Sequence, residues 1–276
     1  MAIIESAGIS DVGKKREGNE DALYLNDDLG LYIVADGMGG HQAGEVASGL
    51  VVETIRDYMK RVREDQDPEE LEDSDDALSK PANQLLSGIH LANRGVHEVA
   101  ISNEAYSGMG STLSAVYFTE DTLIAANVGD SPIYLSHNGN IELLSTTHNV
   151  VTEQLAIDPD AARHISPQYR NLLTRAMGIK ETVEPDVCEI QFFKGDSLVV
   201  SSDGLSDKVS PEEIFDVVNK ERPEKACRVL VDMANERGGE DNITVIVLKV
   251  KTVKEEKSML MKVVSRVLLP FKKIFN

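Results

Sequence analysis

The chain has 276 residues and a formal net charge of −19, from 47 acidic and 28 basic residues. Hydrophobic residues make up 41% of it, which is enough for a sizeable core and excludes a wholly disordered chain. The acidic excess argues against nucleic acid as a partner, because phosphate backbones repel it. With no run of about 18 apolar residues, a membrane-spanning helix is not expected.

The first half of the chain predicts strands followed by two helices. Residues 3–12 and 22–36 alternate or run apolar, as strands do. Residues 42–63 and 80–102 carry apolar side chains at helical spacing. The segment between these helices, residues 64–76, has nine acidic residues and no basic one. We interpret it as a solvated loop, with ion binding as the minor alternative.

The second half predicts short strands, an irregular segment, two more helices and a last strand. Residues 111–118, 122–130 and 132–139 are β-rich runs, which indicates an antiparallel meander. Residues 145–185 are polar and irregular, as functional loops and lids often are. The remaining elements are two strands, two helices and a strand, within residues 188–204, 211–220, 224–238 and 242–250. This order of elements favours an α+β fold over alternating βαβ units.

Residues 251–276 form a tail of different composition. It holds seven basic and two acidic residues, so it carries +5 and leaves −24 on the rest of the chain. Apolar side chains recur among the basic ones, and Pro270 should break or kink a helix there. Residues 257–276 could dock on an anionic membrane surface or on a partner. The equally weighted alternative is that the tail packs on its own acidic body.

Cys188 and Cys227 are the only cysteines, and neither has the spacing of a zinc site. They also lack the setting of a phosphate-binding loop, so we interpret both as core residues. The N-terminus has no basic segment followed by a long apolar run, which argues against a signal peptide. We therefore expect a cytoplasmic monomer with reduced thiols, peripheral to a membrane only through the tail.

Four acidic islands lie beside sharp turns or strand ends. They are residues 19–21, 36–40, 203–204 and 240–242. One such island alone is more often a simple turn, because Asp-Gly and Asp-Asn are common turn formers. An Asp at the end of a buried strand is costly unless its charge is compensated, however, and three of the islands adjoin strongly apolar runs. Divalent cations compensate carboxylates well, and oxygen-only ligands favour magnesium or manganese over zinc or copper.

Two further features concern phosphate. Arg16 stands four residues before Glu20 and could offer a fork of donors to a phosphate bound at such cations. Taken alone, an arginine of this kind is usually a surface residue. The glycines after Asp36 match neither GxGxxG nor GxxxxGK[ST], so a nucleotide-binding loop is disfavoured.

Six motifs, in order and at similar spacing, resemble those of the bacterial metal-dependent protein phosphatases of type 2C. They are RxxNED, VADGMGGHQAGEVAS, GMGSTLSAV, ANVGDS, VVSSDGLSD and GEDNITVIV, and the resemblance covers about residues 5–250. It implies a four-layer αββα sandwich, in which two antiparallel sheets are flanked by helices. It also implies that residues 1–250 are the catalytic domain, with a flap at about 145–175.

The resemblance further implies a binuclear manganese or magnesium centre. Asp36 would bridge the two cations, and Asp203 and Asp241 would hold the first. Glu20 and the Gly37 carbonyl would help to hold the second.

Other roles are carried over from the same motifs. Asp21 and Asn242 would support the ligands from behind, Asp21 through water. Asp130 would join Asp203 at a third cation, and Arg16 would grip the substrate phosphate. Water activated by the cations would then hydrolyse phosphoserine or phosphothreonine without a phosphoenzyme. The partners would be phosphorylated proteins, including a Ser/Thr kinase and its substrates.

The motifs also depart from the family pattern. Met38 stands where many relatives have a His, a candidate proton donor, and Pro132 stands where many have an Arg. His41 is the lesser candidate for that donor, and a capping or structural role is favoured. A common Asp-His-Ser appears here as residues 147–149, Thr-His-Asn. Two alternatives remain open: a catalytically silent regulator on the same fold, and a hydrolase of small phosphoesters.

Overall fold

The computed structural model describes residues 3–40, 42–64, 75–158, 160, 165–166, 169 and 172–253. His41, residues 65–74 of the acidic run and residues 254–276 of the tail lie outside the described residues. Parts of the expected flap, residues 145–175, lie outside them as well. The expectations for these segments stay predictions.

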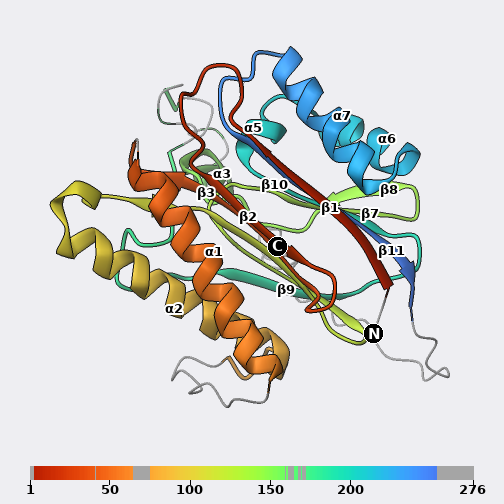
Figure 1. The fold of residues 1–276 in the computed structure, drawn as a ribbon, viewed down its shortest axis with the longest axis horizontal. Coiled ribbons are helices and arrows are strands. Elements are labelled where there is room, and N and C mark those ends of the chain that lie inside the picture. The colour runs from red at the N-terminus through yellow and green to blue at the C-terminus, as the bar shows by residue number, and fades with distance from the viewer. Residues whose placement is uncertain are drawn as a thin grey trace, which may run out of the picture.

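Two antiparallel sheets form the centre of the fold (Figure 1). The first has the strand order β1 (Ile3–Asp11), β11 (Ile243–Thr252), β10 (Ser197–Ser201), β7 (Ile133–His137) and β8 (Asn140–Leu143). The second has the order β2 (Asp21–Asn26), β3 (Leu31–Met38), β5 (Leu113–Phe118), β6 (Thr122–Val128) and β9 (Asp186–Gln191). The short β4 (Gly110–Ser111) pairs with the end of β3.

Helices cover the outer face of each sheet (Figure 1). The second sheet is covered by α1 (Gln42–Arg63) and α2 (Lys80–Ser102). The first sheet is covered by α5 (Asp203–Ser206), α6 (Pro211–Lys220) and α7 (Pro223–Glu236). The short elements η1 (Glu104–Tyr106) and α3 (Val150–Ile157) lie in the connections. The expected four-layer αββα sandwich is confirmed.

The alternation of side chains along each strand explains the layers. In β3, Leu31 and Ile33 face α1 and α2, whereas Tyr32 and Val34 face the other sheet. In the same way, alternate residues of β11 face α7 or the space between the sheets. Because both faces of these strands are buried, their sequences are continuous apolar runs. The acidic residues of the motifs therefore fall only where such runs end.

Two predictions about strands were wrong in detail. Residues 22–36 form a hairpin, β2 and β3, in which Gly30 has a φ of +70° and closes the turn. Residues 132–139 do not continue a meander with the two runs before them. β5 and β6 pair in the second sheet, but β7 pairs with β10 and β8 in the first. The chain crosses between the sheets at residues 129–132. This crossing begins at Gly129, whose φ is +105°.

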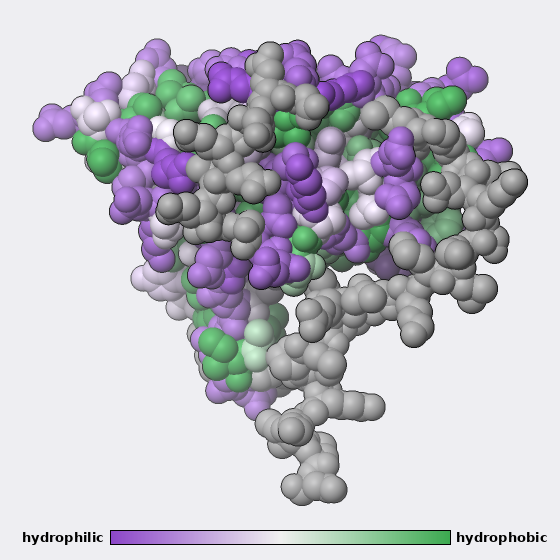
Figure 2. Space-filling model, turned by 90° about the horizontal axis from the view of Figure 1, so that it is seen from below, coloured by the Kyte–Doolittle hydropathy of each residue, from purple (hydrophilic) through white to green (hydrophobic). Residues whose placement is uncertain are grey.

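The surface agrees with the composition. Figure 2 shows a face on which hydrophilic side chains predominate, with apolar ones scattered among them. Across the described residues, no helix is both long and apolar enough to cross a bilayer. Both cysteines are free thiols, and Cys227 is buried, with its Sγ 3.3 Å from the carbonyl oxygen of Ala7.

Candidate metal centre

The four acidic islands meet at one end of the two sheets. Asp21 opens β2 and lies opposite Asp36 in the antiparallel register of β2 and β3. Asp203 follows β10, and Asp241 precedes β11, the strand that pairs with β10 in the first sheet. The carboxyl groups of Asp36 and Asp203 lie beside each other across the sheets, and the Asp203 group raises the pKa of Asp36. Residues far apart in sequence thus become direct neighbours because the strands that carry them end together.

The buried carboxyl groups repel one another. Burial, followed by the charges of Asp21, Asp203 and Asp241, raises the pKa of Asp36 well above its usual value. Burial also raises the pKa of Asp203 and that of Asp21 to about 6, with neighbouring carboxylates adding to both shifts. Oδ1 of Asp21 and Oδ1 of Asp203 are buried without a hydrogen-bond partner. The site therefore holds negative charge that the described side chains leave uncompensated.

Arg16 is the cation that lies nearest to this cluster among the described contacts. Its Nη2 donates to Oδ2 of Asp241 over 2.8 Å, and its side chain remains about half exposed. The other carboxylate oxygen of Asp241 accepts from the backbone N–H of Asn242 over 2.8 Å. Arg16 thus borders the acidic cluster and keeps contact with solvent.

Asn242 holds the loop that carries Arg16 and Glu20. The Asn242 side chain is buried, and its Oδ1 accepts from the backbone N–H of Glu20 over 2.8 Å. Its Nδ2 donates to the carbonyl oxygens of Val12 and Gly18 over 3.0 and 2.9 Å. One amide therefore fixes both ends of this loop against the start of β11.

Gly37 lies where no side chain fits. A Cβ there would come within 2.0 Å of the carbonyl oxygen of Gly44 and 2.6 Å of that of Glu20. The backbone N–H of Gly37 donates to the same Glu20 oxygen over 3.1 Å. The Glu20 carboxyl group packs against Gly44, at the start of α1. Glu20, Gly37 and the first turn of α1 therefore form one closely packed unit beside Asp36.

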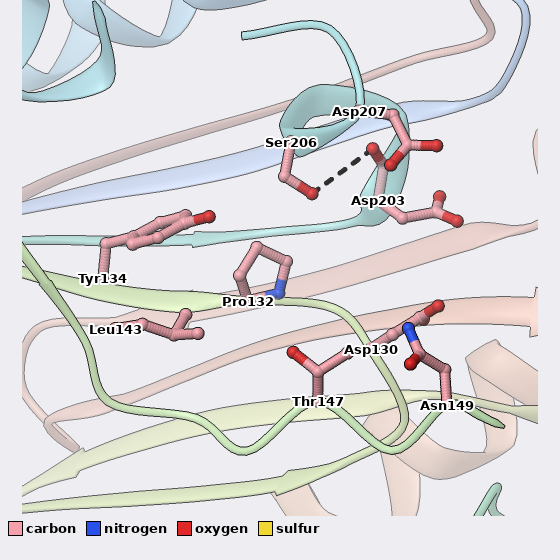
Figure 3. Close-up of a pocket in the computed structure, with 9 residues that line it drawn as sticks. All are labelled: Asp130, Pro132, Tyr134, Leu143, Thr147, Asn149, Asp203, Ser206 and Asp207. Carbon is pink, nitrogen blue, oxygen red and sulfur yellow. Dashed lines mark hydrogen bonds between the residues drawn. The ribbon is translucent and has the colours of Figure 1, made fainter. Parts of the chain in front are cut away.

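A cavity of about 200 Å³ opens next to Asp203 (Figure 3). Asp130, Asp203 and Asp207 line one part of it, and Thr147 and Asn149 face it from the segment before α3. Burial, followed by the charges of Asp203 and Asp207, raises the pKa of Asp130 to about 7. The remaining walls of the cavity are formed by Pro132, Tyr134, Leu143 and Ser206.

Sequence reasoning missed Asp207. The spacing of four residues from Asp203 was the available signal, because it places both carboxylates on one side of a helical turn. Met38, by contrast, packs its Cε against Gly110, 2.7 Å from where a Cβ on Gly110 would stand.

The donor set suits hard divalent cations. No three Asp, Glu, His or Cys side chains in the described part of the chain form a complete ligand set as they stand. Asp241 is instead hydrogen-bonded to Arg16, and the charges of Asp21, Asp203 and Asp241 raise the pKa of Asp36. A bound cation would give the unpartnered buried oxygens a partner and would lower the raised pKa values of these carboxyl groups. All the donors are oxygens, which favours magnesium or manganese.

Fold and site define an α+β sandwich with an oxygen-donor centre for divalent cations where its two sheets end together. The chain belongs to the protein phosphatase 2C family, whose profile matches residues 14–239.

Individual relatives agree with this assignment. The serine/threonine phosphatase stp of Listeria welshimeri is 36% identical over 249 residues, which are 87% of this chain and 93% of the relative. The Mycobacterium tuberculosis serine/threonine phosphatase PstP/Ppp has a similar structure, with a TM-score of 0.75 at 30% identity, over 90% of this chain and 99% of that one. The catalytic domain of PstP in complex with two manganese ions gives a TM-score of 0.76 at 30% identity, over 91% and 100% of the two chains.

Proposed function

We propose that this chain dephosphorylates phosphoserine and phosphothreonine in proteins by attack of water at a centre of two manganese or magnesium ions. The observation that carries this function is that the carboxyl groups of Asp21, Asp36, Asp203 and Asp241 meet in one place. Two of their buried oxygens, Oδ1 of Asp21 and Oδ1 of Asp203, lack hydrogen-bond partners. The activity of the relatives supports the choice of substrate, since they include serine/threonine phosphatases and one structure with two manganese ions.

In this proposal each residue of the cluster has a role toward the cations. Asp36 would be shared by the two cations, Asp203 and Asp241 would hold the first, and Glu20 with the Gly37 carbonyl would hold the second. When bound, the cations supply Lewis-acid chemistry, lowering the pKa of water and neutralising phosphoryl charge. The buried position of the cluster supports this assignment, because desolvated carboxylates gain most from a cation.

Residues around the cluster orient the ligands and the substrate. Asp21 accepts from Ser202 Oγ over 2.8 Å and supports the ligands from behind. Asn242 holds the loop of Arg16 and Glu20 in place. Arg16 would bind the phosphoryl oxygens of the substrate, either in place of Asp241 or with the donors that its bond to Asp241 leaves over. Asp130, with Asp203, would hold a third cation in the adjacent cavity, where Asp207 adds a further carboxylate.

The test is hydrolysis of phosphothreonine and phosphotyrosine peptides across a manganese titration. We expect turnover of the phosphothreonine peptide that depends on Mn²⁺ or Mg²⁺ and is lost in Asp36→Asn. Removing a shared metal ligand costs at least about a hundredfold in activity. Turnover that persists in excess chelator would contradict the proposal.

The organisation of the chain is proposed on the same grounds. Residues 1–250 are the catalytic domain, with a flap at 145–175, and residues 251–276 are a separate tail. The last strand, β11, runs on to Thr252 and so passes this boundary. We propose a cytoplasmic monomer that acts against a Ser/Thr kinase, with residues 257–276 docking on an anionic membrane or a partner. Co-sedimentation of the full chain and of a chain ending at Val253 with anionic liposomes tests the membrane arm. Equal binding would rule it out.

A further inference from the structure

His148 is a buried junction beside the cavity of Asp130. Only 1% of its surface is exposed. Its Nδ1 accepts a hydrogen bond from the backbone N–H of Gly129 over 3.1 Å. Because Nδ1 is the acceptor, the ring proton is on Nε2, which donates to Oδ2 of Asp186 over 2.8 Å. Both ring nitrogens are thus used, and the ring has one orientation that satisfies both partners.

Backbone hydrogen bonds strengthen the same junction. The N–H of His148 donates to the carbonyl oxygen of Gly129 over 2.9 Å. The carbonyl oxygen of His148 accepts from the N–H of Thr174 over 3.0 Å. His148 therefore joins the Gly129–Asp130 turn, both sides of the segment expected to be the flap, and the first residue of β9, Asp186.

The Gly129–Asp130 turn is held from two sides. A Cβ on Gly129 would lie 2.8 Å from the Thr112 side chain, so the turn is packed closely on that side. His148 contacts the turn with its ring and with its backbone. Thr147 and Asn149, the two neighbours of His148, face the same cavity as Asp130 (Figure 3). The position of this one ring therefore sets where three cavity-lining side chains stand relative to Asp203.

Asp186 anchors the far side of the ring. Its hydrogen bond with His148 lowers the pKa of the Asp186 carboxyl group, so the anchor is an anion at neutral pH. Nη1 of Arg175 lies 3.7 Å from Oδ1 of Asp186. The same Nη1 is 3.4 Å from Nε2 of His148, but both atoms are donors in this tautomer, so the carboxylate is the favourable partner.

We propose that His148 is a positioning residue of this enzyme: through Gly129 it places Asp130 for cation binding in the adjacent cavity, with Asp186 as its anchor. The inference rests on the proposed third cation at Asp130. His148 itself contacts neither substrate nor cation. Its influence is on the cation site at Asp130 and on the turnover that depends on this site, because its ring bonds to the Gly129 turn and to Asp186.

Two substitutions separate the two halves of the junction. In His148→Asn the side-chain oxygen takes the place of Nδ1, so the bond from Gly129 is kept and the bond to Asp186 is lost. In His148→Gln the side-chain amide takes the place of Nε2, so the bond to Asp186 is kept and the bond from Gly129 is lost. The matched control is His97→Gln, which removes the contact of Nδ1 with the Gly178 carbonyl oxygen, away from the cavity.

The full chain is titrated with Mn²⁺, and bound ions, affinities and the Mn²⁺ dependence of kcat and KM are measured. We expect His148→Gln to keep two bound ions but to weaken cation binding at Asp130 by about tenfold. Its kcat should fall by about the same factor. His148→Asn should stay within about twofold of the wild type in both, and His97→Gln should leave both unchanged. Equal losses in His148→Asn and His148→Gln, or losses of the same size in His97→Gln, would overturn the proposal.

Amide hydrogen exchange at Gly129 gives a readout independent of activity. Protection should fall in His148→Gln and persist in His148→Asn. If His148→Gln does not fold, Asp186→Ala, at a side chain that is 42% exposed, removes the anchor and keeps the bond from Gly129. It should then match His148→Asn and stay within about twofold of the wild type, and a tenfold loss of cation affinity in Asp186→Ala would overturn the proposal. A wild type without turnover but with this order of exchange would refute the phosphatase function and leave the positioning role of His148. An active wild type with identical variants would refute the positioning role alone.

Discussion

Gly37 is a residue at which the centre is closely packed. Two carbonyl oxygens, those of Gly44 and Glu20, stand where its side chain would begin. We expect Gly37→Ala to destabilise the protein by about 1–3 kcal/mol or more, because backbone on both sides must move. Because the displaced backbone includes the expected cation ligand, Mn²⁺ affinity should fall as well. Urea unfolding and Mn²⁺ titration measure the two effects.

Gly49 is the matched control for Gly37. It lies in α1, and a Cβ there would meet nothing within 4 Å. Gly49→Ala should be neutral or stabilise the protein by up to about 1 kcal/mol, since alanine is the better helix former. Similar losses in the two variants would show that crowding at Gly37 is not the cause.

The buried carboxyl groups make the metal-free protein sensitive to pH. The pKa values of Asp21 and Asp203 are raised to about 6 and that of Asp130 to about 7, whereas an unfolded Asp titrates near 3.8. The folded state therefore holds these protons more tightly than the unfolded state does. This contribution to stability is complete below pH 3.8 and is lost as the pH rises through 6 to 7.

We therefore predict that the chelator-treated protein unfolds at lower urea at about pH 8 than at about pH 5. Saturating Mn²⁺ should remove this trend, because cations replace the protons and bind more tightly as the pH rises. Asp203→Asn, which deletes one of the titrating groups, should flatten the metal-free profile. A metal-free stability that instead increases across this range would contradict the electrostatic account.

At the scale of elements, one buried amide, that of Asn242, bonds the loop between β1 and β2 at three points. The Asn242 side chain makes three hydrogen bonds to the backbone of this loop, at Val12, Gly18 and Glu20. Asn242→Ala should cost about 2–4 kcal/mol, because buried polar groups lose their partners. KM for the phosphopeptide should rise, since this loop carries Arg16.

Asn219→Ala provides the comparison for Asn242→Ala. Asn219 is exposed and its Nδ2 donates to the carbonyl oxygen of Phe215, within α6. Its removal should change stability by less than about 0.5 kcal/mol and leave KM as it was. Thermal unfolding and initial rates separate the two cases, and an unaltered KM in Asn242→Ala would count against the loop as the carrier of phosphate binding.

Strand and helix periods predicted most elements, including both long helices, whereas pairing partners could not be predicted in the same way. The run 132–139 has the same local pattern as the run before it, so it reads as the next strand of a meander. Its true partners, β10 and β8, are chosen by the fit of Leu135 and Ile133 between the sheets. The turn in 22–36 was missed because Gly30, rather than a Pro or an Asn-Gly pair, closes it.

At the scale of the whole molecule, the centre joins the two sheets. Asp21 and Asp36 belong to the sheet of β2 and β3, and Asp203 and Asp241 lie at the ends of β10 and β11. Bound cations should therefore stabilise the entire sandwich. At one hundred times Kd each site adds about 2.7 kcal/mol.

This stabilisation corresponds to a rise in melting temperature of roughly 5 °C or more per site for a chain of this size. Calorimetry in chelator and in Mn²⁺ measures it, with Asp241→Asn as the variant in which most of the rise should disappear. A single cooperative transition is expected in both conditions. A melting temperature that is the same with chelator and with Mn²⁺ would mean that the sheets are not joined in this way.

The sequence alone determined the composition of the layers, the family and the chemical character of the centre. Apolar periodicity is local, and the acidic motifs are short, so both can be read along the chain. The roles expected for Glu20, Asp36, Gly37, Asp130, Asp203 and Asp241 stay predictions, supported by their burial in one place. Only the tertiary structure decided that β7 changes sheets, that Asp207 joins Asp130, and that His148 links the Gly129 turn to Asp186. These relations depend on which strand ends meet in space, and packing between distant segments decides that.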